Sequence, residues 1–214
     1  GRDLRRHQLI KSYYWASISF IDHQVGRMLD TLEETGQLDN TLIIFASDHG
    51  EFLGDYNCFG KRSFLDSAAR VPMICRLPGT FDAGSVCDAP VSLVDIMPTA
   101  MAAAGASAEH MDGKDLAKIA DGSSARDIIF GHYQGADAGI YMATSKDWKY
   151  IWSAADNKEL LFDRNKDPQE LRNRAHNVAC GDAVREMRRR LQDHIRTDGL
   201  QSRRSVCQMI RMPD

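Results

Sequence analysis

This sequence of 214 residues has little excess charge, no long apolar run and no recognisable cysteine motif. Its formal net charge is −3, so it lacks the basic excess with which nucleic-acid-binding domains attract phosphates. No apolar run approaches the roughly 20 residues that a membrane-spanning helix requires. We therefore predict neither a nucleic-acid partner nor a membrane span.

The cysteines do not form a framework that indicates a function. They occur singly, at Cys58, Cys75, Cys87, Cys180 and Cys207, without the CxxC or Cys/His spacing of a zinc site. An odd number is also unlike a disulfide framework, although one bridge between Cys75 and Cys87 stays open. We find no convincing nucleophile motif around any of them.

The first half of the sequence has the pattern of an α/β layer. Apolar residues recur at helical spacing over residues 9–35, and a second helix is expected over residues 91–105. Apolar runs at residues 41–46 and 71–76 indicate buried strands of the kind found in parallel sheets. Residues 106–126 are polar and rich in Gly and Asp, so we expect a loop there.

The second half has a different pattern. Short strand-like segments at residues 127–130, 140–144, 148–153 and 158–162 are separated by turn residues, which favours an antiparallel meander. Residues 182–195 form an amphipathic helical pattern that could cover one face of this sheet. We therefore predict a large α/β domain over residues 1–124 and an α+β subdomain over residues 125–214.

The candidate chemistry follows the first apolar run, which ends in Ser-Asp-His-Gly at positions 47–50. Open α/β folds place their chemistry beyond the carboxyl ends of such strands. The Asp48 carboxylate can bind a hard divalent cation there, or it can serve as a turn cap. His49 reaches the same cation if the chain curls, which Gly50 permits, although a lone histidine is more often structural.

A glycine-rich loop then leads to Lys61, whose ammonium group suits a tetrahedral oxyanion. The ordinary alternative is a solvated surface lysine. Glu51 and Asp55 are further possible metal ligands, although acidic loop residues are usually just solvated.

These motifs resemble the sulfatase family of the alkaline phosphatase superfamily. The run SDHGEFLGDYNCFGKRSF, followed by RVPMICRLPG, is similar to the family's strand end, glycine-rich loop, lysine and Arg-Val-Pro strand. The segments SISFIDHQVGRMLDTLEETGQLDNT and PVSLVDIMPTAMAAAG resemble its flanking helices, and WKYI, ELLFDRNKDPQE and LRN resemble its C-terminal subdomain. The resemblance spans roughly residues 13–195. It implies part of an alkaline-phosphatase-like mixed sheet sandwiched by helices, followed by the small subdomain.

The resemblance also implies a reaction, the hydrolysis of aryl or carbohydrate sulfate esters. In this family a formylglycine attacks sulfur beside a divalent cation, usually Ca²⁺. Asp48 and His49 match the second pair of metal-site residues, and Lys61 matches the lysine that contacts the sulfate. His132 is a further candidate for substrate contact, because the family's C-terminal subdomain borders the active-site mouth; a turn histidine with no catalytic role is the commoner case.

Several family features are missing from the sequence: the formylglycine motif, the first Asp pair of the metal site and the other basic residues around the sulfate. Their place in the family is N-terminal to the matched motifs. We therefore expect a C-terminal portion that needs the rest of its own polypeptide and is inactive alone. The sequence predicts neither the oligomeric state nor the compartment, although glycan-acting relatives are often periplasmic or secreted.

His49 leaves two alternatives open. Many family members have Asn there, whereas some sulfatases and the related phosphonate and phosphate ester hydrolases have His. Nitrogen ligation would also shift the preference from Ca²⁺ toward Mn²⁺ or similar ions. The resemblance favours Ca²⁺, and Mn²⁺ or Mg²⁺ are the alternatives. His49 thus keeps open a phosphonate or phosphate ester hydrolase, and the missing formylglycine motif separately keeps open a non-catalytic protein descended from the fold.

Overall fold

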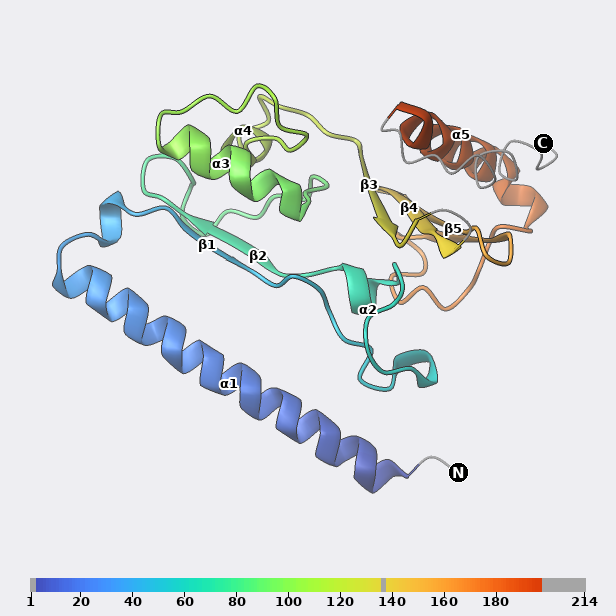
Figure 1. Ribbon diagram of the computed structural model, residues 1–214, viewed down its shortest axis with the longest axis horizontal. Helices are drawn as coiled ribbons and strands as arrows, with labels where there is room; N and C mark the ends of the chain where they lie inside the picture. The colour runs from blue at the N-terminus through green and yellow to red at the C-terminus, as the bar shows by residue number, and fades with distance from the viewer. Residues whose placement is uncertain (1–2, 136–137, 198–214) are drawn as a thin grey trace.

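A computed structural model describes residues 3–135 and 138–197 and contains two antiparallel sheets (Figure 1). The first sheet pairs β1 (Ile43–Ala46) with β2 (Met73–Arg76). The second is a meander of β3 (Ile128–Tyr133), β4 (Ile140–Ser145), β5 (Trp148–Ser153) and β6 (Lys158–Asp163). The mixed α/β architecture that we predicted is thus present. No helix in the described ranges has the length and apolarity that crossing a membrane requires.

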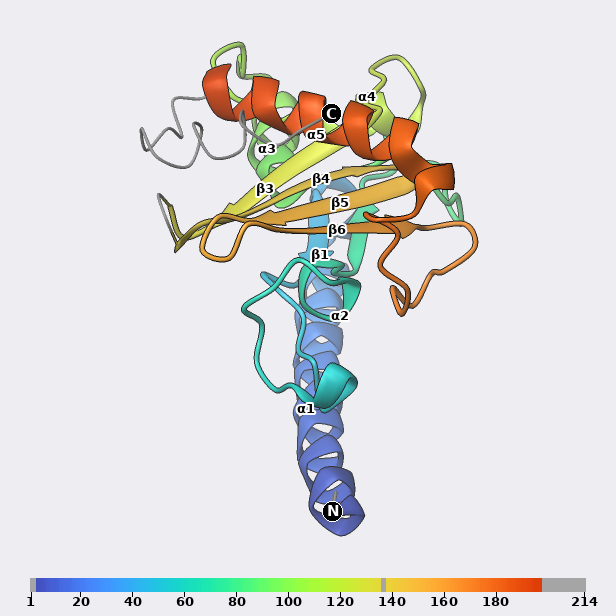
Figure 2. The same ribbon diagram turned by 90° about the vertical axis from the view of Figure 1, so that its right-hand side faces the viewer.

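The longest helix, α1 (Leu4–Glu34), lies along one side of the β1–β2 ribbon (Figures 1 and 2). It begins at Asp3, whose carboxylate accepts a hydrogen bond from the Arg6 amide at 3.1 Å. It ends before Gly36, which has φ of 67° and so adopts the left-handed conformation typical of a helix terminus. No side chain of α1 is buried in the described chain.

The other side of the β1–β2 ribbon faces α3 (Ile96–Ala103) and α4 (Leu116–Ala120) (Figure 1). A short 3₁₀ turn at Leu93–Asp95 precedes α3, and its last residue is fully buried. The Asp95 carboxylate accepts hydrogen bonds from the Ser92 and Lys114 amides and two from the Arg126 guanidinium, all at 2.7–2.8 Å. This carboxylate therefore joins α3 to the segment that enters the meander.

Both faces of the meander are covered. Strand alternation directs Tyr150, Trp152 and Leu161 toward α5 (Gly181–Thr197), which packs Val184, Met187, Leu191 and Ile195 against them (Figure 2). Met142, Ile151 and Phe162 point to the opposite face and pack against Phe64 and Leu65. The segment just after Lys61 is thus part of the packing of the C-terminal sheet.

The structure differs from the sequence predictions in several ways. β1 and β2 run antiparallel and are only partly buried, with Phe45 and Ile74 side by side and exposed. The prediction that these are buried parallel strands was therefore wrong. It rested on their apolar runs, which carry no information on strand direction. The predicted loop at residues 106–126 contains α4, and the Cys75 and Cys87 thiols are both free. The domain boundary at residues 124–125, which stays a prediction, falls between α4 and β3.

Candidate active site

The Ser-Asp-His-Gly sequence forms a tight turn directly after β1. The Ser47 hydroxyl donates to the His49 carbonyl at 2.8 Å, and Asp48 Oδ1 accepts from the His49 amide at 3.0 Å. The Gly50 amide donates to the Ala68 carbonyl, in α2 (Asp66–Ala69), at 2.8 Å. A Cβ at Gly50 would lie 2.1 Å from the Ser67 carbonyl oxygen, so this close contact with α2 requires glycine.

The three predicted site residues meet at this turn. His49 Nδ1 lies 2.8 Å from the Gly50 carbonyl oxygen, which can only accept, so Nδ1 is the donor in this contact. Nε2 lies 3.2 Å from Asp48 Oδ2 and accepts a hydrogen bond from Lys61 Nζ. A carboxylate, an imidazole lone pair and an ammonium group therefore converge at the end of β1.

Glu51 brings Lys61 back to the turn. Its Oε1 accepts hydrogen bonds from the Gly60 amide at 2.6 Å and the Leu53 amide at 3.2 Å, and the Phe52 amide donates to the Gly60 carbonyl at 3.0 Å. Glu51 thus closes the loop immediately before Lys61. Asp55, the other acidic residue of this loop that was considered as a metal ligand, accepts a hydrogen bond from the Ser67 hydroxyl at 2.7 Å. Both carboxylates hold the loop, a role that the sequence did not indicate.

The loop is conformationally strained. Leu53, Tyr56 and Asn57 have φ between 48° and 60°, in the left-handed region that side chains other than glycine disfavour. Each such residue costs about 1–2 kcal/mol and persists where its surroundings determine it. Strain concentrated beside converging polar groups is typical of functional sites.

Asp48 Oδ2 and His49 Nε2 lie 3.2 Å apart and are donor atoms of the kind that a divalent cation binds, but the Lys61 ammonium group contacts Nε2 in this structure and would have to move aside for a cation to bind there. Within residues 3–135 and 138–197, no cluster of three carboxylate, imidazole or thiol side chains is placed to hold a metal. The Asp48 side chain is 82% exposed and that of His49 37%. These two side chains alone would supply only part of the coordination sphere of a metal ion.

The structure does not bring His132 into this group. It lies on β3 opposite Tyr141, with an exposed side chain, and no hydrogen bond or ion pair joins it to Asp48, His49 or Lys61 in the described chain. The arginines of α5 are paired with nearby carboxylates, such as Arg188 with Glu159 at 2.8 Å.

Comparison with known proteins identifies the family. A family model described as Sulfatase matches residues 5–106. An arylsulfatase of Clostridium perfringens is 42% identical over 171 residues, which cover 76% of this chain and 35% of that protein. The chain belongs to the sulfatase family. This sulfatase chain spans about a third of the length of such relatives.

Two solved structures place the sulfatase chain in the alkaline phosphatase-like fold. The protein BT4656, solved in complex with its substrate D-glucosamine-2-N,6-O-disulfate, aligns with a TM-score of 0.76 and 28% identity, over 86% of this chain and 40% of that one. A phosphonate monoester hydrolase of Agrobacterium radiobacter aligns with a TM-score of 0.78 and 29% identity, over 88% and 41%. The predicted fold class and family are thereby confirmed.

Proposed function

We propose that the full-length polypeptide containing this chain hydrolyses sulfate esters, with Asp48, His49 and Lys61 in its active site. The observation that carries the proposal is the convergence of these three side chains at the end of β1, in a chain of the sulfatase family. Their roles follow from the family motifs that they match.

Asp48 and His49 are proposed to bind a divalent cation, Ca²⁺ in the first place, with Mn²⁺ or Mg²⁺ as alternatives. The Gly50 carbonyl supports this role, because a metal-binding histidine usually donates its other ring N–H to such an acceptor. When bound, the cation supplies a Lewis acid that polarises a sulfate oxygen.

Lys61 is proposed to bind the sulfate group as a compact positive charge. Its ammonium group contacts His49 in this structure, so a sulfate bound by Lys61 would lie close to a cation bound by His49 once the ammonium group has left Nε2. Fixed positive charge at this point stabilises the negative charge that develops in the transition state. The proposed nucleophile is a formylglycine outside these 214 residues, whose hydrated aldehyde supplies the attacking oxygen.

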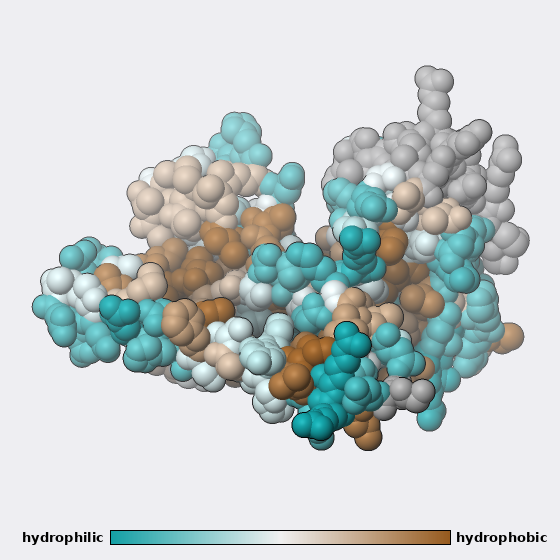
Figure 3. Space-filling model, turned by 60° about the horizontal axis from the view of Figure 1, so that its bottom comes forward, coloured by the Kyte–Doolittle hydropathy of each residue, from teal (hydrophilic) through white to brown (hydrophobic). Residues whose placement is uncertain are grey.

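We also propose that the rest of the polypeptide completes and covers the site. The largely exposed Asp48 side chain supports this, because such charges act most strongly where water is excluded. Apolar side chains of α1, among them Tyr13, Trp15 and Ile18, are exposed as well. Apolar patches are visible between hydrophilic ones on the face shown in Figure 3. Patches of this kind usually mark a surface that another part of a protein covers.

The second candidate is a phosphonate or phosphate ester hydrolase. Two observations favour it: the imidazole of His49 beside the Asp48 carboxylate, and the TM-score of 0.78 to the phosphonate monoester hydrolase. Sulfate and phosphate esters share tetrahedral geometry, so Asp48, His49 and Lys61 are compatible with the hydrolysis of either kind of ester. The relative rates of hydrolysis of sulfate and phosphate or phosphonate esters distinguish the two candidates.

The test uses the full-length polypeptide, produced with its formylglycine, on four probes: p-nitrophenyl sulfate, glucosamine 6-sulfate, p-nitrophenyl phosphate and p-nitrophenyl phenylphosphonate. We expect sulfate release, and a loss of kcat/KM of at least a hundredfold in Lys61→Ala. Lys166→Ala is the matched control, because that side chain is 83% exposed and lies away from β1, and it should match the wild type.

Two results would change the assignment. Faster turnover of the phosphate or phosphonate ester by orders of magnitude would establish the second candidate. No turnover of any probe by protein with formylglycine would leave a non-catalytic protein of this fold.

A further inference from the structure

A buried ionic cluster contacts the backbone just after Lys61. Lys149, Asp66 and Glu170, hereafter the Lys149 cluster, join β5, the start of α2 and the turn after β6. The side chains of Lys149 and Glu170 are each 2% exposed. Removing such charges from water is costly unless they are paired and hydrogen-bonded, so the cluster fixes its members in one arrangement.

The cluster holds the backbone just after Lys61. Lys149 Nζ pairs with the Asp66 carboxylate, lies 2.6 Å from Glu170 Oε1 and donates to the Phe64 carbonyl at 3.0 Å. Glu170 Oε2 accepts from the Asp66 amide at 2.6 Å. Two backbone groups three and five residues beyond Lys61 are thus bound by side chains of the C-terminal sheet and its following turn.

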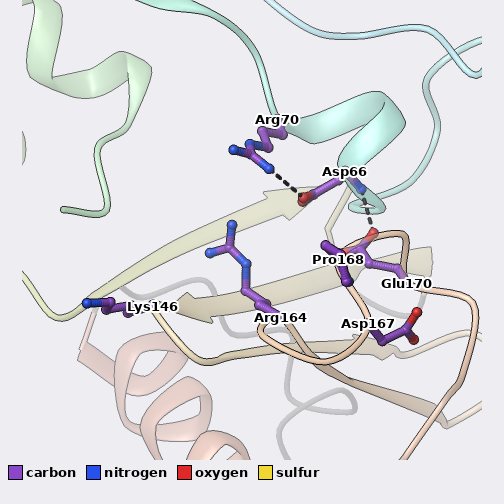
Figure 4. A pocket seen from close by; sticks show the side chains of 7 residues that line it. All are labelled: Asp66, Arg70, Lys146, Arg164, Asp167, Pro168 and Glu170. Carbon is purple, nitrogen blue, oxygen red and sulfur yellow. Dashed lines mark hydrogen bonds and ion pairs between the residues drawn. The ribbon is translucent and has the colours of Figure 1, made fainter. Parts of the chain in front are cut away.

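Asp66 is shared with a second cation. Its other carboxylate oxygen lies 3.8 Å from Arg70, at the edge of a cavity of about 190 Å³. Figure 4 shows Asp66 between Arg70 and Glu170. The carboxylate therefore keeps its position by contacts on two sides.

From α2 the contacts continue to the metal-ligand turn. Asp66 is the first residue of α2, and the Ala68 carbonyl in the same turn of helix accepts from the Gly50 amide at 2.8 Å. The Gly50 carbonyl in turn accepts from His49 Nδ1. One short helix, fixed by the Lys149 cluster, is therefore bonded to both the His49 turn and the Lys61 loop.

A further contact and local strain support a specific role for this arrangement. The Tyr56 hydroxyl, in the loop before Lys61, donates to the Gln169 carbonyl at 2.6 Å. Glu170 itself has φ of 55°, a conformation that only strong surrounding contacts maintain for such a residue. Burial raises the pKa of Glu170, and the positive charge of Lys149 opposes that rise.

We propose that Lys149 and Glu170 are positioning residues: through Asp66 and α2 they fix Lys61 and His49 relative to each other. The inference rests on the proposed function for its catalytic consequence, but not for its structural part. Neither residue touches the candidate site, so their effect passes through the backbone of residues 50–68.

The test compares Glu170→Gln, Lys61→Ala and the double variant in the full-length polypeptide. Glu170→Gln keeps the side-chain shape and removes the charge that pairs with Lys149. We expect kcat/KM for p-nitrophenyl sulfate to fall about tenfold, and the effect to shrink to threefold or less in the Lys61→Ala background, because the position of an absent lysine has no consequence. A purely structural role would give the same tenfold loss in both backgrounds.

Hydrogen exchange supplies a readout that needs no substrate. Amides of peptides covering residues 50–61 should exchange at least tenfold faster in Glu170→Gln, with the β3–β6 sheet unchanged. The matched control is Glu159→Gln, which removes a buried carboxylate from the α5 side of the same sheet, where it pairs with Arg188. This control should leave exchange at residues 50–61 at the wild-type rate.

The outcomes separate the two proposals. A wild-type protein without sulfatase activity refutes the proposed function. The hydrogen exchange of residues 50–61 still tests in that case whether the Lys149 cluster holds this segment. Unchanged exchange in residues 50–61 together with multiplicative kinetics refutes the positioning role alone. If Glu170→Gln does not fold, Tyr56→Phe removes one surface hydrogen bond between the same segments, and an unchanged exchange rate at residues 50–61 then refutes the proposal.

Discussion

Replacing Gly50 by alanine tests whether the site depends on the contact between the Asp48–His49 turn and α2. The added Cβ would lie 2.1 Å from the Ser67 carbonyl oxygen, whereas real contacts of this kind essentially never fall below 3.0 Å. The turn and α2 must therefore separate by about 1 Å, which also weakens the bond from the Gly50 amide to Ala68.

The cost follows from these contacts. Overpacking of this kind costs about 1–3 kcal/mol, and a lost backbone hydrogen bond about 1 kcal/mol. A displacement of about 1 Å at a catalytic group lowers the rate about a hundredfold. We therefore expect Gly50→Ala to lose about 2–4 kcal/mol of stability and about a hundredfold in kcat.

The assay measures kcat, KM and the free energy of unfolding of the full-length polypeptide. Gly135→Ala is the matched control, because a Cβ there meets no atom within 4 Å and the residue does not have a positive φ. It should behave as wild type. Wild-type kcat and stability in Gly50→Ala would refute the argument that the turn is held against α2.

Three further outcomes are expected. Asp95→Asn leaves the buried Arg126 guanidinium without its carboxylate, and denaturant unfolding should show a loss of about 3–5 kcal/mol; a loss below 1 kcal/mol would contradict this. Burial raises the pKa of Tyr56, so its neutral form is favoured in the folded state; its contribution to stability is complete below pH about 10 and is lost as pH rises through the folded pKa. The stability of the wild type relative to Tyr56→Phe should accordingly decrease as pH rises above about 10, and a difference independent of pH would argue against it. The isolated 214-residue chain should release no sulfate from p-nitrophenyl sulfate, and turnover above background would show that it needs no other part of the polypeptide.

The elements that could be predicted from the sequence are those with a strong local pattern. The predicted strand at residues 148–153 matches β5 because its alternating residues face two apolar environments, α5 on one side and Phe64 with Leu65 on the other. The amphipathic pattern at residues 182–195 likewise lies within α5, since one stripe of the helix must cover the sheet. Such patterns describe an element and its buried face, but they do not describe its partners.

The properties that were mispredicted depend on partners far away in the sequence. The direction of β1 relative to β2 is set by the course of the chain between them, which apolar runs do not encode. The Lys149 cluster joins Lys149 to Asp66 across 83 positions, and the Asp66 amide to Glu170 across 104. No spacing rule links residues that are so far apart. From the sequence alone, Lys149 and Glu170 are therefore indistinguishable from ordinary solvated side chains.

The convergence of Asp48, His49 and Lys61 could be predicted because it is local. Thirteen or fewer positions separate them, and glycines together with the Glu51 carboxylate close the loop within that span. What keeps the site in one geometry is not local, because α2 is bonded to Gly50 on one side and to Glu170 on the other. A motif can therefore indicate which side chains of a loop converge, whereas the contacts that hold such a loop come from residues far away in the sequence.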